Sequence, residues 1–154
     1  MKIVFHLEFL KPSRKASQSF KSSAAFDLFE EYVSRISRYL EIDVEGSILN
    51  SAKVLTSNDE FWICDRGAKA KILSSEAVAD RLRLSLGSGK KVLRIVIGGP
   101  DGFEEEFFKK HPQCLRWSFG PMTLPHELAS LVAAEQCYRA FTIIKNEPYH
   151  LGHK

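Results

Sequence analysis

The hydrophobic and polar positions of this chain repeat with two periods, one typical of β-strands and the other of α-helices. Short apolar stretches predict strands. The stretch 92–97 is nearly continuous and rich in β-branched residues, as in a central strand of a parallel sheet that is covered on both faces. The predicted strands are residues 3–7, 41–44, 60–64, 92–97 and 115–119.

Apolar side chains three and four residues apart predict the helices between these strands. Ser22 and Ser23 can cap one helix, and Ser74 can begin a second helix that ends at Gly87. Their inward faces are expected to hold Phe26, Phe29, Val33, Ile36 and Leu40, and then Val78, Leu82 and Leu86. We also expect a short helix at 103–110, a long one at 125–144, and a polar, basic loop at 11–21.

Strands that alternate with helices predict an α/β fold, with a mainly parallel sheet flanked by helices. A chain of 154 residues has the usual length of one domain, so 1–154 is expected to form a single unit. The helix predicted at 125–144 is apolar on more than one side. A helix at the end of a small domain normally shows water one face, so we expect a homodimer that covers the second face. The alternative is a helix central to the core of the monomer.

Composition and charge narrow the function only slightly. The formal charge of +3 is modest, so binding to nucleic acid would depend on geometry as well as on counterion release. No stretch is long and apolar enough for a membrane span, so we expect a cytoplasmic protein with no membrane contact. Three cysteines, Cys64, Cys114 and Cys137, lie far apart without metal-ligand spacing; they are expected to be reduced packing residues, and no metal is predicted.

Three segments are candidates for chemistry. The glycine-rich stretch 97–103 follows the predicted central strand, where ligands of open α/β sheets bind, although such a stretch is as often a plain turn. The stretch 117–126 holds two prolines and a glycine, and it can recognise a ligand through backbone groups or simply set the direction of the last helix. The tail 146–154 carries Tyr149, His150 and His153, but chain ends are usually frayed.

The same three segments, together with a motif at 134–140, resemble one family. In order along the chain they are Ile-Gly-Gly-Pro-Asp-Gly at 97–102, Trp-Ser-Phe at 117–119 with Met-Thr-Leu-Pro-His at 122–126, Ala-Glu-Gln-Cys-Tyr-Arg-Ala at 134–140, and Asn146 with Pro-Tyr-His at 148–150. Asp-Arg-Gly at 65–67 and Leu-Ser-Ser-Glu at 73–76 extend the match upstream. This pattern resembles the SPOUT-class large-subunit rRNA pseudouridine N3-methyltransferases, called methyltransferase H.

That resemblance implies a SPOUT α/β-knot fold, in which the C-terminal part forms a deep trefoil knot, and a homodimer. It implies S-adenosyl-L-methionine (SAM) as cofactor, bound by Cys64, Gly98, Phe119, Gly120, Pro121, Met122, Thr123 and Leu124. It places Arg139, Tyr149 and His150 near the methyl group, beside the partner subunit's cofactor. The implied reaction is SAM-dependent methylation of N3 of a pseudouridine in 23S rRNA on the assembled ribosome. Tyr149 and His150 would orient the base or assist proton removal, and Arg139 would stabilise negative charge or anchor a phosphate.

The chain departs from the family pattern at two places in its N-terminal half and at one place in its tail. The link after the first strand is expanded at 11–21, the segment 45–59 is short, and Leu151 stands where the family often has a basic residue. Candidates for contacts with the RNA backbone are Lys11, Arg14, Lys15, Arg66, Lys69 and Lys71.

The alternative functions are a SPOUT methyltransferase acting on tRNA or another rRNA site, and a non-catalytic dimeric ribosome-binding factor. A Rossmann oxidoreductase is disfavoured because the dinucleotide fingerprint is missing.

Overall fold

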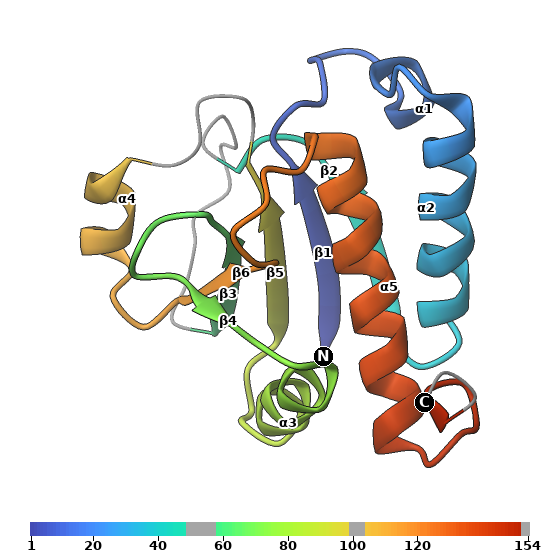
Figure 1. Ribbon diagram of the computed structural model, residues 1–154, viewed down its shortest axis with the longest axis vertical. Helices are drawn as coiled ribbons and strands as arrows, with labels where there is room; N and C mark the ends of the chain where they lie inside the picture. The colour runs from blue at the N-terminus through green and yellow to red at the C-terminus, as the bar shows by residue number, and fades with distance from the viewer. Residues whose placement is uncertain (49–57, 99–103, 152–154) are drawn as a thin grey trace.

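The computed structural model describes residues 1–48, 58–98 and 104–151 of the chain. Helices and strands alternate along it, as the sequence predicted (Figure 1). The elements are β1 (Lys2–Leu7), α1 (Ala16–Ser19), α2 (Ser23–Ile36), β2 (Glu41–Glu45), β3 (Asp59–Cys64), β4 (Lys71–Ile72), α3 (Ser75–Leu86), β5 (Val92–Ile97), α4 (Glu105–Lys110), β6 (Leu115–Ser118) and α5 (His126–Ile144).

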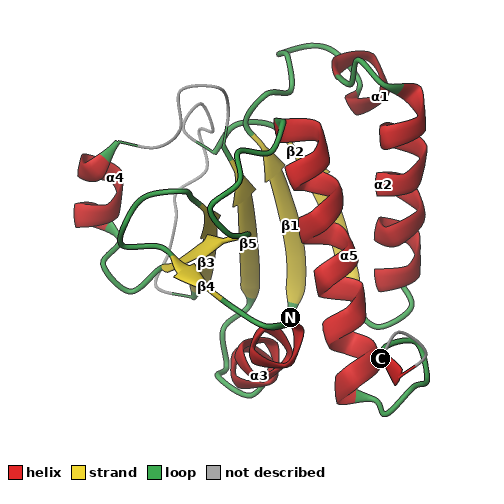
Figure 2. Ribbon diagram, in the orientation of Figure 1, coloured by secondary structure: helices red, strands yellow, loops and turns green. Residues whose placement is uncertain are grey.

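The strands form one sheet in the order β2-β1-β5-β3-β6-β4, and every pairing in it is parallel. The apolar strand β5 lies between β1 and β3, which confirms the central strand expected from its composition. Figure 2 shows the strands side by side, with helices packed around the sheet. All the carboxyl ends of these strands therefore lie along one edge, where α/β proteins usually bind their ligands.

The main core lies between one face of the sheet and the helices α2, α3 and α5. Alternate residues of β1 and β5 supply its floor, and Phe29, Leu82 and Phe141 close it from the three helices. Figure 1 shows α2 and α5 side by side over the sheet, with α3 nearer the amino ends of the strands. α5 thus packs between two helices and against the sheet, and of its residues, all of which are described, only Leu128 is exposed.

This packing decides how the apolar faces of α5 are covered. The alternative of a helix central to the monomer core matches the structure, so its apolar composition alone does not require a second chain. The homodimer stays a prediction that rests on the resemblance. The trefoil knot also stays a prediction.

The opposite face of the sheet holds a buried polar chain beside a smaller apolar cluster. His6 on β1 contacts the Gly46 carbonyl through Nδ1, at 3.0 Å, and the Arg94 guanidinium through Nε2, at 2.9 Å. Arg94 also donates to the Asp59 carboxylate at 3.0 Å. Because buried polar groups are costly when they lack partners, this chain of bonds ties β1, β5 and β3 into one register.

Side-chain caps fix the starts of two helices where the sequence placed them. The Ser22 hydroxyl accepts from the Ala25 amide at the start of α2, and Ser74 accepts from Ala77 at the start of α3. The Glu127 carboxylate accepts hydrogen bonds from the backbone amides of Lys21 and Ser22, each at 3.1 Å. The start of α5 is therefore fastened to the start of α2.

Several local expectations were wrong. The loop 11–21 contains the short helix α1, and the two-residue strand β4 gave no pattern long enough to detect. The apolar spacing continues to Leu40, but α2 ends at Ile36, and Leu86 at the end of α3 is 39% exposed rather than inward. The helix expected at 103–110 is α4, which begins at Glu105, and residue 103 lies outside the described residues.

Candidate functional site

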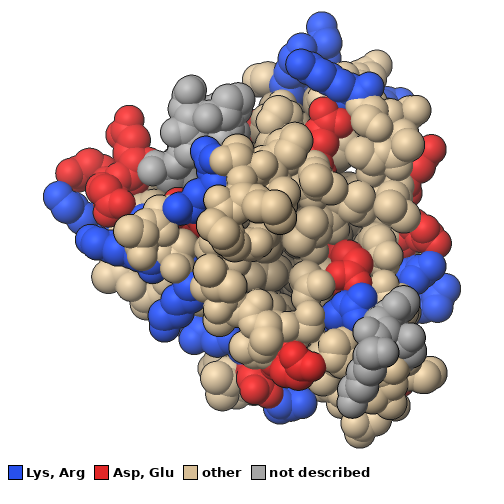
Figure 3. Space-filling view, viewed as in Figure 1, with Lys and Arg blue, Asp and Glu red and all other residues tan. Residues whose placement is uncertain are grey.

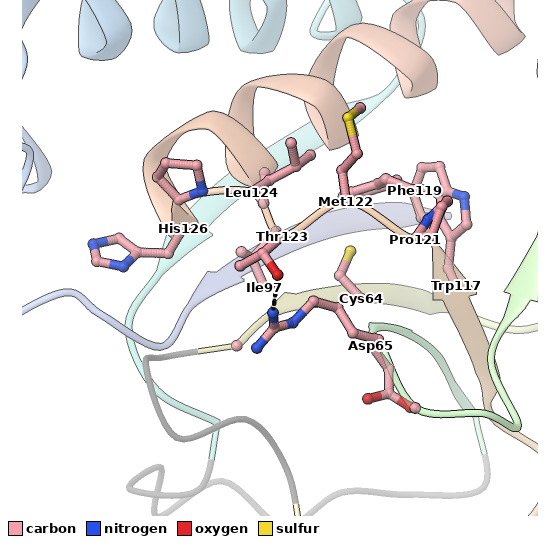
Figure 4. Close-up of a pocket in the computed structure, with 16 residues that line it drawn as sticks. Cys64, Asp65, Ile97, Trp117, Phe119, Pro121, Met122, Thr123, Leu124 and His126 are labelled. Carbon is pink, nitrogen blue, oxygen red and sulfur yellow. Dashed lines mark hydrogen bonds between the residues drawn. The ribbon is translucent and has the colours of Figure 1, made fainter.

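A cavity of about 720 Å³ opens at the carboxyl ends of β3, β5 and β6. Cys64, Gly98 and Trp117, at or just beyond the ends of those strands, line one side of it, and the loop before α5 lines the other (Figure 4). This volume lies within the range of small-molecule sites in proteins, roughly 300–1,000 Å³. Its place at the carboxyl edge also agrees with the general rule for ligands of parallel sheets.

All eight residues that the resemblance assigned to the cofactor line this one cavity: Cys64, Gly98, Phe119, Gly120, Pro121, Met122, Thr123 and Leu124. The remainder of the glycine-rich stretch, 99–103, lies outside the described residues. Met122 lines the cavity at its rim, since the residue is 70% exposed. The spatial grouping agrees with the sequence assignment, and the role of these residues in cofactor binding stays a prediction.

The loop after β6 is held in a tight turn. Gly120 has a φ of +107°, a conformation that side-chain-bearing residues rarely adopt. Its amide donates to the Ser118 hydroxyl at 3.1 Å, and that hydroxyl donates to the Gly120 carbonyl at 3.3 Å. The backbone of this loop is therefore fixed before any ligand binds, which reduces the entropy that binding must offset.

The side chains at the end of β3 divide between the cavity and an ion-pair network. Figure 4 shows the Cys64 sulfur directed towards the loop, while the Asp65 carboxylate points away from it. Burial raises the pKa of the Cys64 thiol far above its ordinary value, so the group stays neutral. The Arg116 guanidinium donates to Asp65 at 2.9 Å and to Glu105 at 3.1 Å. The negative charge of the Asp65 carboxylate is therefore balanced by the Arg116 guanidinium.

Arg66 crosses between the two walls of the cavity. Its guanidinium donates to the Thr123 hydroxyl at 2.7 Å, the bond drawn as a dashed line in Figure 4. The sequence suggested Arg66 as an RNA-backbone contact, which stays a prediction; in the structure Arg66 is exposed and also lines the cavity. His126, the first residue of α5, also lines the cavity, and its ring lies 4.3 Å from that of Phe9.

The three residues expected near the methyl group form a second cluster. Arg139 donates from Nη1 to His150 Nδ1 at 3.0 Å, and its guanidinium lies over the Tyr149 ring at 4.9 Å. Glu135 accepts two hydrogen bonds from Arg139, at 2.6 and 2.9 Å, and one from the Tyr149 hydroxyl at 3.1 Å. The tail through His150 is thus docked on α5, contrary to the expectation of a frayed end.

Two further residues complete this cluster, and the sequence did not assign them. The Glu76 carboxylate, at the start of α3, contacts His150 Nε2 at 2.8 Å. The Tyr32 hydroxyl, on α2, lies 3.3 Å from that of Tyr149. Burial raises the pKa of Tyr149 well above its usual range, and the bonds to Tyr32 and Glu135 add to this effect. Glu135 had a sequence signal in its four-residue spacing from Arg139 on a helix, and Glu76 belongs to a motif of the resemblance, but neither was given a role.

The cavity and the cluster lie at opposite ends of α5. His126 lines the cavity in the first turn, and Arg139 belongs to the cluster 13 residues later. A helix rises about 1.5 Å per residue, so along α5 Arg139 is roughly 20 Å from His126 and roughly 15 Å from Ala129, the last residue of the helix in the lining. A small ligand that stays within this lining therefore does not reach Arg139 of the same chain.

Positive charge on the described surface is spread in patches. Figure 3 shows Lys and Arg side chains gathered over α1 and the segment before it, where Lys11, Arg14 and Lys15 are exposed. Acidic and basic side chains are mixed near α4 in the same view. Arg66, Lys69 and Lys71 are also exposed, so all six RNA-contact candidates lie on the surface.

Comparison with known proteins identifies the family. Residues 16–150 match a family model described as predicted SPOUT methyltransferase. The chain belongs to the SPOUT methyltransferase family. The matched span contains the described lining of the cavity and the whole Arg139–Tyr149–His150 cluster. The parallel sheet with flanking helices agrees with the SPOUT fold class predicted from the sequence.

Curated relatives of this SPOUT methyltransferase carry one name, ribosomal RNA large subunit methyltransferase H. The protein of that name from Koribacter versatilis is 39% identical over 145 residues, which cover 86% of this chain and 92% of the relative. Another, from Flavobacterium psychrophilum, is 34% identical over 143 residues, 80% of this chain and 87% of the relative. A third, from Xylella fastidiosa, is 45% identical over 84 residues.

The described residues contain neither a membrane-spanning helix nor a group of metal ligands. Among the helices of the described part of the chain, none has the length and apolar character needed to cross a membrane. Within the same residues, no three His, Cys, Asp or Glu side chains converge in a way that would hold a metal ion.

Proposed function

We propose that this SPOUT methyltransferase transfers a methyl group from SAM to N3 of a pseudouridine in 23S rRNA, on the assembled ribosome. The observation that carries the proposal is the grouping of all eight cofactor residues around one cavity at the carboxyl edge of the sheet. The names of the relatives, which cover most of this chain, support large-subunit rRNA as the substrate.

The cavity fits SAM in chemistry as well as in size. Phe119 and Leu124 offer apolar surface, and the fixed backbone of the loop offers amide and carbonyl groups for an adenine. The neutral Cys64 thiol adds no charge, while the Arg66 guanidinium is a suitable partner for the carboxylate of the methionine moiety. When bound, SAM supplies an electrophilic methyl group on its sulfonium.

The target base binds between this cavity and the cluster of a second subunit. Arg139 of one chain lies roughly 15–20 Å along α5 from the residues of that helix that line its own cavity, too far to act on a methyl group held there. A homodimer that brings the partner's cluster to the cavity resolves this separation. The dimer is therefore part of the proposed active site, although the packing of α5 alone does not demand it.

Alignment is the main task of the protein in this reaction. Methyl transfer is an in-line displacement, so holding the base nitrogen against the methyl carbon accounts for much of the rate enhancement. The imide nitrogen also has to lose its proton. Tyr149 and His150 orient the base or assist that loss, and Arg139 stabilises the negative charge that develops on the ring.

RNA docks on the exposed cations near the carboxyl edge of the sheet, including Lys11, Arg14 and Lys15. The formal charge of +3 is too small for tight binding by counterion release alone. The shape of a structured target has to supplement these contacts. For this reason the assembled ribosome is proposed as a better substrate than naked rRNA.

One experiment tests the whole proposal. Purified protein and labelled SAM are incubated with ribosomes that lack the modification, and any methyl group is mapped by mass spectrometry of rRNA fragments. Methylation at N3 of a large-subunit pseudouridine is the expected result. Transfer to tRNA or to another rRNA site would replace the proposed target. No transfer together with no SAM binding would favour a non-catalytic ribosome-binding factor.

A further inference from the structure

The hydrogen bonds around His150 define which of its nitrogens carries a proton. Arg139 contacts Nδ1 through a guanidinium N–H, at 3.0 Å, and a guanidinium has no acceptor. Nδ1 therefore accepts. The other nitrogen, Nε2, lies 2.8 Å from the Glu76 carboxylate, which accepts when ionised, so Nε2 carries the hydrogen and donates it.

We propose that Glu76 is a positioning residue for methyl transfer: it holds His150 in the tautomer whose Nδ1 lone pair takes the proton from the target base. This inference rests on the proposed function and names the proton acceptor within it. Without RNA, the Nδ1 lone pair is engaged by Arg139 Nη1. The N3–H of the base takes that place when RNA binds, and the guanidinium moves to the developing negative charge on the ring.

The proton and electron balance of this step is complete. The N3–H bond breaks, its proton passes to His150 Nδ1, and its electron pair stays on N3. That pair forms the new bond to the methyl carbon as the carbon–sulfur bond of the sulfonium donor breaks, with its electrons left on sulfur. The resulting imidazolium faces the Glu76 carboxylate through Nε2–H, an ion pair that stabilises it, and later returns its proton to water.

The other groups of the cluster suit this role less well. Tyr149 has a raised pKa and donates its hydroxyl hydrogen to Glu135, so it is a neutral donor rather than a base. Glu135 already accepts from Arg139, Tyr149 and Gln136. The charged groups that contact the His150 ring are Glu76 from α3 and Arg139 from α5. Both contacts favour the hydrogen on Nε2, but the base replaces Arg139 at Nδ1, so Glu76 is the group that still holds this tautomer during transfer.

The test compares Glu76→Ala and Glu76→Gln in the full-length chain, with Asp80→Asn as a control. Asp80 lies on the same helix and pairs with Arg83 at 2.8 Å, outside the cluster. The tautomer is read by ¹⁵N NMR of the imidazole nitrogens in the protein without RNA. The chain has five histidines, and a His150→Gln spectrum assigns the signal of His150. SAM affinity and the kcat and KM for ribosomes are measured in parallel.

The wild type and Asp80→Asn are expected to show His150 with the hydrogen on Nε2. Glu76→Ala is expected to shift the Nε2 signal of His150, because the carboxylate that accepts its hydrogen is lost, and to lower kcat by about ten- to a hundredfold, within the range of acid–base catalysis. Glu76→Gln keeps an acceptor oxygen but not the charge, so its kcat is expected to lie between the two. SAM affinity and KM should stay unchanged, because a general weakening of the tail would alter KM as well.

Two results would overturn the inference. One is a Glu76→Ala enzyme that methylates ribosomes at the full wild-type kcat, and the other is a wild-type His150 with its hydrogen on Nδ1. Failure of the proposed function has a different signature, since the wild type itself would then transfer no methyl group to rRNA, whatever the NMR spectrum shows.

Discussion

The two ends of α5 carry two different kinds of site. At the first turn, a cavity is bounded by apolar side chains and by a loop whose backbone is fixed at Gly120. At the last turns, Arg139, Glu135 and His150 form a cluster of charged and polar groups that hold one another in place. One end therefore offers a shaped, largely uncharged surface, and the other offers a network of hydrogen-bonded charged and polar groups.

The length and rigidity of α5 keep the cavity and the cluster of one chain apart. α5 packs against α2, α3 and the sheet, so it cannot bend to bring its own ends together. Residues at the cavity end should therefore affect methyl-donor binding, and residues at the cluster end should affect turnover. Variants that change one quantity and spare the other measure how complete this separation is.

The largest effect is expected at the cluster end. His150→Ala removes the imidazole that contacts Arg139 and Glu76, so turnover should fall by about a hundredfold or more, while SAM affinity stays unchanged. Single-turnover rates on ribosomes and calorimetric titration with SAM give the two quantities. Lys145→Ala, at the exposed C-cap of α5, serves as control and should alter neither. Equal loss of turnover and SAM affinity would refute the role of His150 in catalysis.

The next effect belongs to the cavity end. Gly120→Ala places a Cβ at a φ of +107°, which strains the loop, so SAM affinity should fall about tenfold, equivalent to about 1.4 kcal/mol. Turnover at saturating SAM should change much less. Calorimetry measures the affinity, and urea denaturation measures the cost in stability.

Gly89→Ala is the matched control for that variant. Gly89 also has a positive φ, +80°, and a Cβ there would likewise meet nothing within 4 Å. It lies between α3 and β5, and it is not part of the cavity lining. A similar loss of stability without loss of SAM affinity is expected. If both variants weakened SAM binding equally, the effect would reflect general strain rather than the shape of the loop.

These two sites also differ in how far the sequence predicted them. The eight residues assigned to the cofactor all line the cavity, because the resemblance rests on local motifs such as 117–126 that keep their spacing along the chain, whereas Arg66 and His126 in the same lining were not assigned to it. The same motifs identified Arg139, Tyr149 and His150. Their partner Glu76 is 74 residues from His150, and Asp65 is 51 residues from Arg116. Pairs of this kind depend on how distant segments pack, and no periodicity in the chain encodes them.

The fold shows the same limit. Strand β5 was predictable because six consecutive residues carry the signal, whereas β4 has only two residues and exists through its pairing with β6. The apolar character of α5 was read correctly, but composition cannot say which neighbour covers each face. α2 and α3 supply that cover within the monomer. Arg94 is a similar case, because its buried place in β5 depends on Asp59 and His6.

A smaller effect should show which ligand Arg66 serves. Arg66→Gln removes the guanidinium that donates to Thr123 across the cavity, so SAM affinity should fall by about threefold to tenfold, as for one lost hydrogen bond. The KM for ribosomes should stay constant. Lys69→Gln, at an exposed cation three residues further on, should instead raise that KM slightly and leave SAM binding intact. The reverse pattern would mean that Arg66 contacts RNA rather than SAM.

The smallest effect concerns the ionisation of the cluster. Burial and the bonds to Tyr32 and Glu135 raise the pKa of Tyr149 above its usual 10, and burial with the Glu147 bond raises that of Tyr39 to about 12. A raised pKa means that the folded state holds the phenol proton more tightly than the unfolded chain. The resulting stabilisation is complete below about pH 10 and is lost as the pH rises towards the folded-state pKa.

Tyr149→Phe tests this directly. Phenolate absorbance of the folded wild type, which has four tyrosines, should include a late phase well above pH 10. The variant should lose amplitude from that late phase alone. Urea denaturation at pH 8 and pH 10.5 should show a smaller drop in stability for the variant than for the wild type, because one linked proton has been removed. Loss of an early phase instead would mean that Tyr149 ionises readily, and a phenolate base would then replace the neutral donor at this end of α5.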